Sequence, residues 1–213
     1  MRNIALILAP AVALAVAARI IDMYVPAAGA GAFAVALVPA PLMASEVVSR
    51  MRGPMDLAGA LAHGTIAVSL LFIGGRGTVA AGGLFTATKA FAIAAMVSNG
   101  LPRLRDAILM PLRLVGWLAA AVVVAVAITP VPPIDAMTIV TGLVLFIVGA
   151  LTAVVSATLV GREVIASVAG AGLRDPVLAI AFAMFVTNSQ SSSVAIVYGL
   201  CCLALTVFVL LLR

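Results

Sequence analysis

The sequence is 213 residues long, 65% of it is hydrophobic and only 9% is charged, and its mean hydropathy is +1.34. An average soluble domain is about half apolar and about a quarter charged, which excludes a soluble fold of this size. The net charge of +5 does not indicate nucleic-acid binding, because the twelve basic residues lie singly or in pairs at the ends of apolar runs and form no basic patch. We therefore expect an all-α polytopic membrane protein whose main partner is the lipid bilayer.

Apolar runs long enough to cross a hydrocarbon core about 30 Å thick recur along the whole chain. The predicted helices, in chain order, cover residues 4–22, 30–49, 56–74, 78–99, 107–129, 134–160, 163–185 and 189–212. The breaks between them carry turn chemistry, as in Gly74-Gly75-Arg76-Gly77 and Pro130-Val131-Pro132-Pro133. The first run has features of a secretory signal peptide, but the seven spans that follow favour an uncleaved first helix.

The basic residues predict the orientation, because the cytoplasmic ends of membrane helices carry an excess of Lys and Arg. With eight spans and an inside N-terminus, only Arg19 and Arg76 fall outside. The basic residues that fall inside are Arg2, Arg50, Arg52, Arg103, Arg105, Arg162 and Arg213. We expect a multi-pass protein of the plasma (inner) membrane with both termini in the cytoplasm.

Two of the predicted helices are interrupted near their centres. The helix at 163–185 contains Ala169-Gly170-Ala171-Gly172-Leu173-Arg174-Asp175-Pro176, and the helix at 30–49 contains Pro39-Ala40-Pro41 followed by Ser45-Glu46. Proline removes a helical hydrogen bond and clashes with the preceding turn. An Arg or Asp at the centre of a membrane helix costs about 2.5–3.5 kcal/mol even on insertion scales, so these stretches must face protein or water.

The interrupted helices occupy matching places in the chain. One is the middle helix of a first triplet, residues 1–74, and the other is the middle helix of a second triplet, residues 131–213, with a two-helix panel at 75–130 between them. The triplets start five spans apart, so they enter the membrane from opposite sides. Inverted three-helix repeats that each carry a broken helix are the best sequence-level pointer to the binding site of a secondary transporter.

Two motifs resemble those of a known family. Gly172-Leu173-Arg174-Asp175-Pro176-Val177-Leu178-Ala179 resembles the Gly-aliphatic-Arg-Asn-Pro-x-Leu-Ala signature on the second crossing helix of the bile acid:sodium symporter family. Pro41-Leu42-Met43-Ala44-Ser45-Glu46-Val47, with Gly53 and Asp56-Leu57-Ala58 after it, is similar to the first crossing helix. The resemblance covers nearly the whole chain. It implies a shortened member that lacks the first two helices and keeps a core of two inverted triplets.

The family's sodium ligands are only partly matched. Ser45 matches the family's serine, whereas Glu46 and Asp175 stand where the family has asparagines. Gly170 replaces a glutamate, and Ala58 and Ala62 in the helix at 56–74 stand where the family has hydroxyl residues. The resemblance therefore makes sodium coupling doubtful and favours coupling to protons or none, so the candidate coupling ion is Na+ or H+. No other cofactor and no metal site are expected.

Other polar residues have structural as well as functional interpretations. Lys89 lies near the centre of the helix at 78–99, where it is expected to face the bundle. Lys89 would either form a structural ion pair with a carboxylate of the bundle or take part in coupling or anion binding. His63 is expected to be a hydrogen-bonded structural residue. The chain has no metal-binding His/Glu motif and no G-x-S-x-G elbow, so it is not expected to be an enzyme.

These patterns favour a secondary transporter that moves an organic anion or a small amphipathic solute by alternating access. Half-helix N-termini carry partial positive charge, which favours an anionic substrate. The residues expected to bind substrate or ion are Ser45, Glu46, Lys89, Gly172, Arg174, Asp175 and Pro176. The alternative is a non-transporting membrane subunit or structural partner derived from such a transporter, and a homodimer is an intermediate possibility.

The predicted topology is testable with reporter fusions. A fluorescent protein fused after Arg213 should report the cytoplasm, and a phosphatase inserted after Pro130 should report the exterior, because an odd number of spans separates the two positions. Reporter activities that place both positions on one side of the membrane would contradict the eight-span topology.

Overall fold

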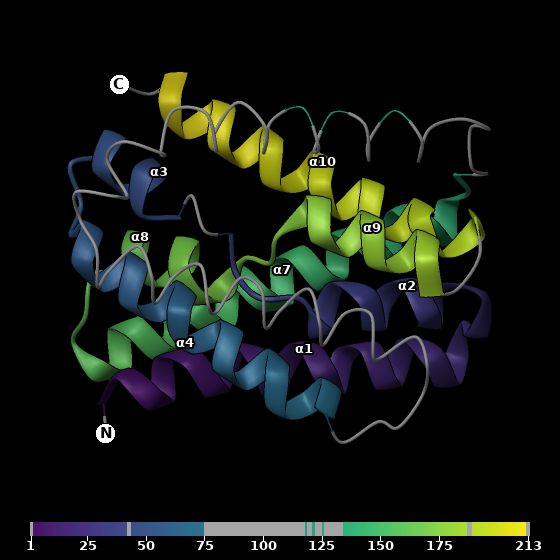
Figure 1. Cartoon of the computed structure of the whole chain (residues 1–213), viewed down its shortest axis with the longest axis horizontal. Coiled ribbons are helices and arrows are strands. Elements are labelled where there is room, and N and C mark those ends of the chain that lie inside the picture. Colours follow the sequence, from purple (N-terminus) through teal and green to yellow (C-terminus); the bar gives the residue numbers. More distant parts are fainter. Residues whose placement is uncertain are drawn as a thin grey trace.

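The computed structural model describes residues 2–41, 44–74, 134–186 and 189–211, with the isolated helical positions 118, 121 and 125 (Figure 1). Within these ranges every regular element is a helix. Three helical segments there are long and apolar enough to cross a membrane, namely Asn3–Tyr24, Ala136–Val160 and Val164–Met184. The prediction of a helical membrane protein is therefore confirmed. Apart from the three isolated positions, the helices predicted at 78–99 and 107–129 lie outside the described residues.

The helices fall into two groups along the chain. The first group is α1 (Arg2–Tyr24), α2 (Pro26–Leu37), α3 (Ala44–Arg50) and α4 (Met55–Gly74). The second group is α7 (Ala136–Val160), α8 (Val164–Ser167), the π-helical turn η1 (Val168–Gly172), α9 (Pro176–Val186) and α10 (Ser189–Leu211). The helices predicted at 4–22, 56–74, 134–160 and 189–212 match α1, α4, α7 and α10 to within two residues at each end. Each of the two predicted interruptions is present as a break between shorter helices.

The ends of the helices follow from local chemistry. Val25 alone separates α1 from α2, because Pro26 begins the new helix at a position where its missing N–H costs nothing. Asp135 caps α7 by accepting a hydrogen bond from the Thr138 amide at 2.7 Å, and hydrogen bonds from Thr138 lower the pKa of Asp135. Gly161 ends α7 in the left-handed conformation, with φ of 68°.

α1 and α7 pack side by side and run in opposite directions (Figure 1). Leu6, near the start of α1, shares a buried cluster with Ala157, near the end of α7. Leu14, farther along α1, shares another cluster with Leu145, nearer the start of α7. Between residues 4 and 20 of α1, the large apolar side chains that are exposed recur at every fourth residue and are Ile4, Leu8, Val12, Val16 and Ile20. Such a continuous apolar stripe is suited to contact with lipid.

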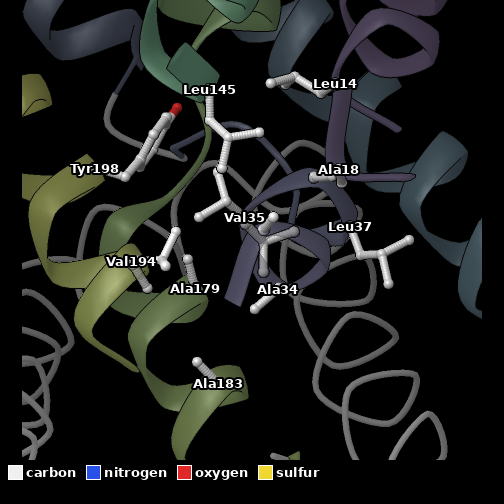
Figure 2. Packing of buried hydrophobic residues seen from close by; sticks show 14 of the residues in the cluster. Leu14, Ala18, Ala34, Val35, Leu37, Leu145, Ala179, Ala183, Val194 and Tyr198 are labelled. Atoms are coloured by element: carbon white, nitrogen blue, oxygen red, sulfur yellow. The ribbon is translucent and has the colours of Figure 1, made fainter. Parts of the chain in front are cut away.

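The main buried cluster joins five helices, α1, α2, α7, α9 and α10. Figure 2 shows small side chains such as Ala34 and Ala179 beside larger ones from the neighbouring helices. The largest is Tyr198 of α10, whose ring packs edge-to-face with that of Phe146 at a centroid distance of 6.4 Å. Membrane helices gain no hydrophobic free energy by associating in lipid, so this close packing of small residues contributes much of the attraction.

Two glycines let α7 and η1 approach at the backbone level. A Cβ atom on Gly149 would collide with the carbonyl oxygen of Gly172. A Cβ atom on Gly172 would lie 2.6 Å from the Cβ of Ala153. The position of the second break against α7 therefore depends on the absence of a side chain at these two residues.

Substituting Gly149 should destabilise the fold. In Gly149→Ala the new methyl group meets a backbone carbonyl, which cannot rotate away as a side chain can, so we expect a loss of about 1–3 kcal/mol. Thermal unfolding in detergent measures the effect. Gly161→Asn is the matched control, because position 161 has open space around it and asparagine tolerates its positive φ. Equal melting temperatures for the two variants would contradict this account of the packing.

Candidate functional site

The first break lies between α2 and α3, where Val38, Pro39 and Ala40 follow the last helical residue without continuing the helix. The Ala40 amide donates to Oγ1 of Thr65 on α4 at 2.9 Å, and both residues are buried. The Thr65 hydroxyl in turn donates to the carbonyl of Ala62 at 2.7 Å. A backbone donor freed by the break is thus paired by a side chain on a neighbouring helix, as a site without water requires.

The second break lies between η1 and α9 and consists of Leu173, Arg174 and Asp175. The Arg174 amide donates to the phenol oxygen of Tyr198 on α10 at 2.6 Å. Pro176 is the first residue of α9, where proline is well tolerated, so it starts a helix here and does not kink one.

Asp175 caps the N-terminus of α9. Its Oδ1 accepts hydrogen bonds from the amides of Val177 and Leu178, both at 3.0 Å. The carboxylate therefore satisfies two of the amides that begin the helix and complements the positive end of the helix dipole. One oxygen of this predicted binding residue is already engaged by the chain itself.

The two breaks touch each other. The Asp175 amide donates to the carbonyl oxygen of Pro39 at 2.9 Å, although the two residues are 136 positions apart. The contact joins the second break to the first through the backbone, without a side chain between them. We call the residues 38–41 and 173–175 the junction.

The two halves of the junction use the same device. In each, a freed amide donates to a side-chain hydroxyl on the uninterrupted helix that follows the break. The donor and acceptor are 25 residues apart for Ala40 and Thr65, and 24 residues apart for Arg174 and Tyr198. The two spacings thus differ by one residue.

Arg174 brings a positive charge into the junction. Its side chain is among the largest fully buried ones, with 1% of its surface exposed. The side-chain atoms Nε and Nη2 are buried and have no hydrogen-bond partner in the described part of the chain. Among the described residues, the salt bridge that forms joins Arg19 and Asp22 at the exposed end of α1, far from the junction in sequence. No described carboxylate therefore neutralises Arg174. Burying an unpaired charge is costly, and such a residue in a membrane protein points to function.

The positions that the family resemblance relates to sodium ligands are close-packed and apolar. A Cβ atom on Gly170 would lie 2.6 Å from the carbonyl oxygen of Ala58 and 3.1 Å from the Cβ of Leu61. Ala62 lies in a buried cluster with Ala40 and Ala44. The backbone of α4 thus fills the space that a longer side chain at position 170 would need.

The remaining predicted site residues are placed as follows. Gly172 packs against α7, as described above, and Pro176 begins α9. Ser45 and Glu46 belong to α3, but their side chains lie outside the described residues, as does all of Lys89. His63 is exposed, and its Nδ1 lies 2.6 Å from the carbonyl oxygen of Gly59 on its own helix, which fits the structural interpretation.

Sequence reasoning missed Thr65 and Tyr198. Both are polar residues inside apolar helices, and Tyr198 is one of two tyrosines in the chain. A broken membrane helix needs an acceptor for each freed amide, but which hydroxyl supplies it depends on how the helices pack, so the sequence alone carries no signal for these two residues.

No family model matches this chain, and no curated protein matches it.

Removing either hydroxyl should destabilise the junction. Tyr198→Phe leaves the Arg174 amide unpaired and Thr65→Val leaves the Ala40 amide unpaired, and each buried, unpaired donor costs about 1–3 kcal/mol. Thermal unfolding in detergent measures the loss. Thr152→Val is the control, since the Thr152 hydroxyl donates only to the Val148 carbonyl of its own helix. A loss no larger than that of the control would show that the two hydroxyls do not support the junction.

Proposed function

We propose that this protein is a secondary transporter, similar to the bile acid:sodium symporters, that moves an organic anion or a small amphipathic solute by alternating access. The observation that carries the proposal is the hydrogen bond from the Asp175 amide to the Pro39 carbonyl, which joins two interrupted helices at their breaks. Broken helices supply backbone donors and acceptors inside a membrane protein, where an ordinary helix offers none to a solute. A structural subunit has no need of this arrangement.

The packing of the helices supports an inverted repeat. α1 and α7 form an antiparallel central pair, and α1 packs against α2 and α4 as α7 packs against η1 and α10. Across the two groups, α4 packs against η1 as α10 packs against α2. Exchanging the first triplet for the second thus reproduces these contacts. A repeat of this kind lets the same junction open toward either side through equivalent motions of its two halves.

The positions of the chain ends agree with the proposed topology. α1 begins and α10 ends at the same end of the molecule, on the left of Figure 1. An even number of spans with both termini in the cytoplasm would produce this arrangement. The basic residues near these ends, counted above, favour the cytoplasmic side.

The close packing at Gly170 and Ala58 bears on the coupling ion. A sodium ion needs several oxygen ligands, and the described side chains at these positions offer none. We therefore propose coupling to protons, or no coupling, with Asp175 and Glu46 as the carboxylates available for proton binding.

Uptake into liposomes tests the function. With the purified protein, a panel of radiolabelled organic anions should be accumulated, and an imposed sodium gradient at fixed pH and voltage should leave the rate unchanged. Asp175→Asn, which keeps a capping oxygen but removes the charge, should slow uptake. Asp135→Asn is the matched control, because Asp135 also caps a helix but lies at the exposed start of α7.

Two other outcomes of the uptake experiment would contradict parts of this proposal. Strong stimulation of wild-type uptake by sodium would overturn the proposed coupling and assign Glu46 and Asp175 to a rebuilt cation site. No uptake of any anion under sodium, proton or voltage gradients would reject transport and favour the non-transporting membrane subunit.

A further inference from the structure

The buried guanidinium of Arg174 has a defined unsatisfied edge. The two atoms without a partner in the described structure, Nε and Nη2, lie on the same side of the planar group. Their N–H bonds point in parallel toward one location. This edge is the one through which arginine holds the two oxygens of a carboxylate side-on.

We infer that Arg174 binds the carboxylate of a monoanionic solute side-on at the junction through Nε–H and Nη2–H. This inference rests on the proposed function, because it takes the carboxylate to be the anionic group of the transported solute. The charge selects the class of ligand. One positive charge in a site of low dielectric is neutralised by one negative charge, whereas a phosphate dianion would leave a buried charge uncompensated.

Two described polar groups next to the Arg174 backbone are engaged elsewhere. Oδ1 of Asp175 accepts from the amides that begin α9 and forms no salt bridge with Arg174. The Tyr198 oxygen accepts from the backbone amide of Arg174. Neither group completes the unsatisfied edge of the guanidinium.

The backbone beneath the guanidinium is fixed from two directions. The Arg174 amide is held by Tyr198 on α10, and the next amide, that of Asp175, is held by the Pro39 carbonyl in the first break. The guanidinium therefore projects from a segment whose position both halves of the protein determine. Such preorganisation reduces the entropy that carboxylate binding would otherwise cost.

Burial gives carboxylate binding a consequence for the transport cycle. Arg174 is 1% exposed in this structure, so a solute reaches the guanidinium only when the junction opens. Closing over a free guanidinium buries a bare charge, while closing over a guanidinium–carboxylate pair buries a neutral, hydrogen-bonded unit. The loaded protein therefore closes more readily than the empty one.

Benzoate and benzamide test the site, because they have nearly the same shape and differ in charge. In thermal unfolding of the purified full-length protein at constant ionic strength, benzoate should raise the melting temperature, and benzamide and inorganic phosphate should not. Arg174→Lys keeps the charge but loses the pair of parallel N–H bonds, and should weaken benzoate binding about tenfold or more. Arg162→Lys, at an exposed arginine between α7 and α8, should bind benzoate as the wild type does.

Several results would overturn the inference. They are no benzoate effect in the wild type, an undiminished effect in Arg174→Lys, and an equal effect of phosphate. A benzoate effect that appears only in Glu46→Gln would assign Arg174 to an internal ion pair and would also overturn it. If Arg174→Lys does not fold, wild type labelled with nitrogen-15 arginine decides. Benzoate should then shift one Nε–H resonance in its NMR spectrum, and no shift would reject the site.

The inference and the proposed function fail separately. Benzoate binding that depends on Arg174, together with no uptake into liposomes, would leave the carboxylate site standing and reject transport. Uptake of anions that Arg174→Lys retains in full would support transport and reject the site.

Discussion

The structure depends on one requirement, that every backbone amide freed inside the membrane by a break in a helix finds an acceptor. Lipid offers no hydrogen bonds, and each unpaired amide costs several kcal/mol. The amides at Ala40, Arg174 and Asp175 are paired by Thr65, Tyr198 and Pro39 respectively. Two of these bonds tie a break to a neighbouring long helix, α4 or α10, and the third ties the two breaks together.

This requirement explains why small residues gather around the junction. A hydrogen bond between two backbones needs them within about 3 Å, so the flanking helices must approach closely. Gly149 and Gly172 allow this approach between α7 and η1, and Gly170 allows it against α4. The same close packing leaves no space beside Ala58 for a side chain at position 170.

The breaks were predictable from the sequence, and their partners were not. Pro39-Ala40-Pro41 cannot continue a helix and Pro176 favours a new start, so local chemistry locates both interruptions. The predicted helix at 30–49 begins four residues later than α2, because one residue, Val25, suffices for the turn before Pro26. Thr65 and Tyr198 could not be assigned as acceptors, since their roles depend on how helices far apart in sequence pack. For the same reason, the burial of Arg174 without a described partner emerges only in three dimensions.

The hydrogen bond between the two breaks can be measured directly by solid-state NMR in lipid. The protein is labelled with carbon-13 at the proline carbonyls and with nitrogen-15 at the aspartate amides. Since the sequence contains no Pro-Asp peptide bond, every coupling between these two labels acts through space. The bond predicts a distance of about 4 Å between the Pro39 carbonyl carbon and the Asp175 nitrogen. Pro39→Ala keeps the carbonyl but removes its label, so the difference between the two spectra isolates this pair. A coupling that corresponds to about 4 Å and disappears in Pro39→Ala is the predicted result, and identical dephasing in the two proteins would contradict the junction.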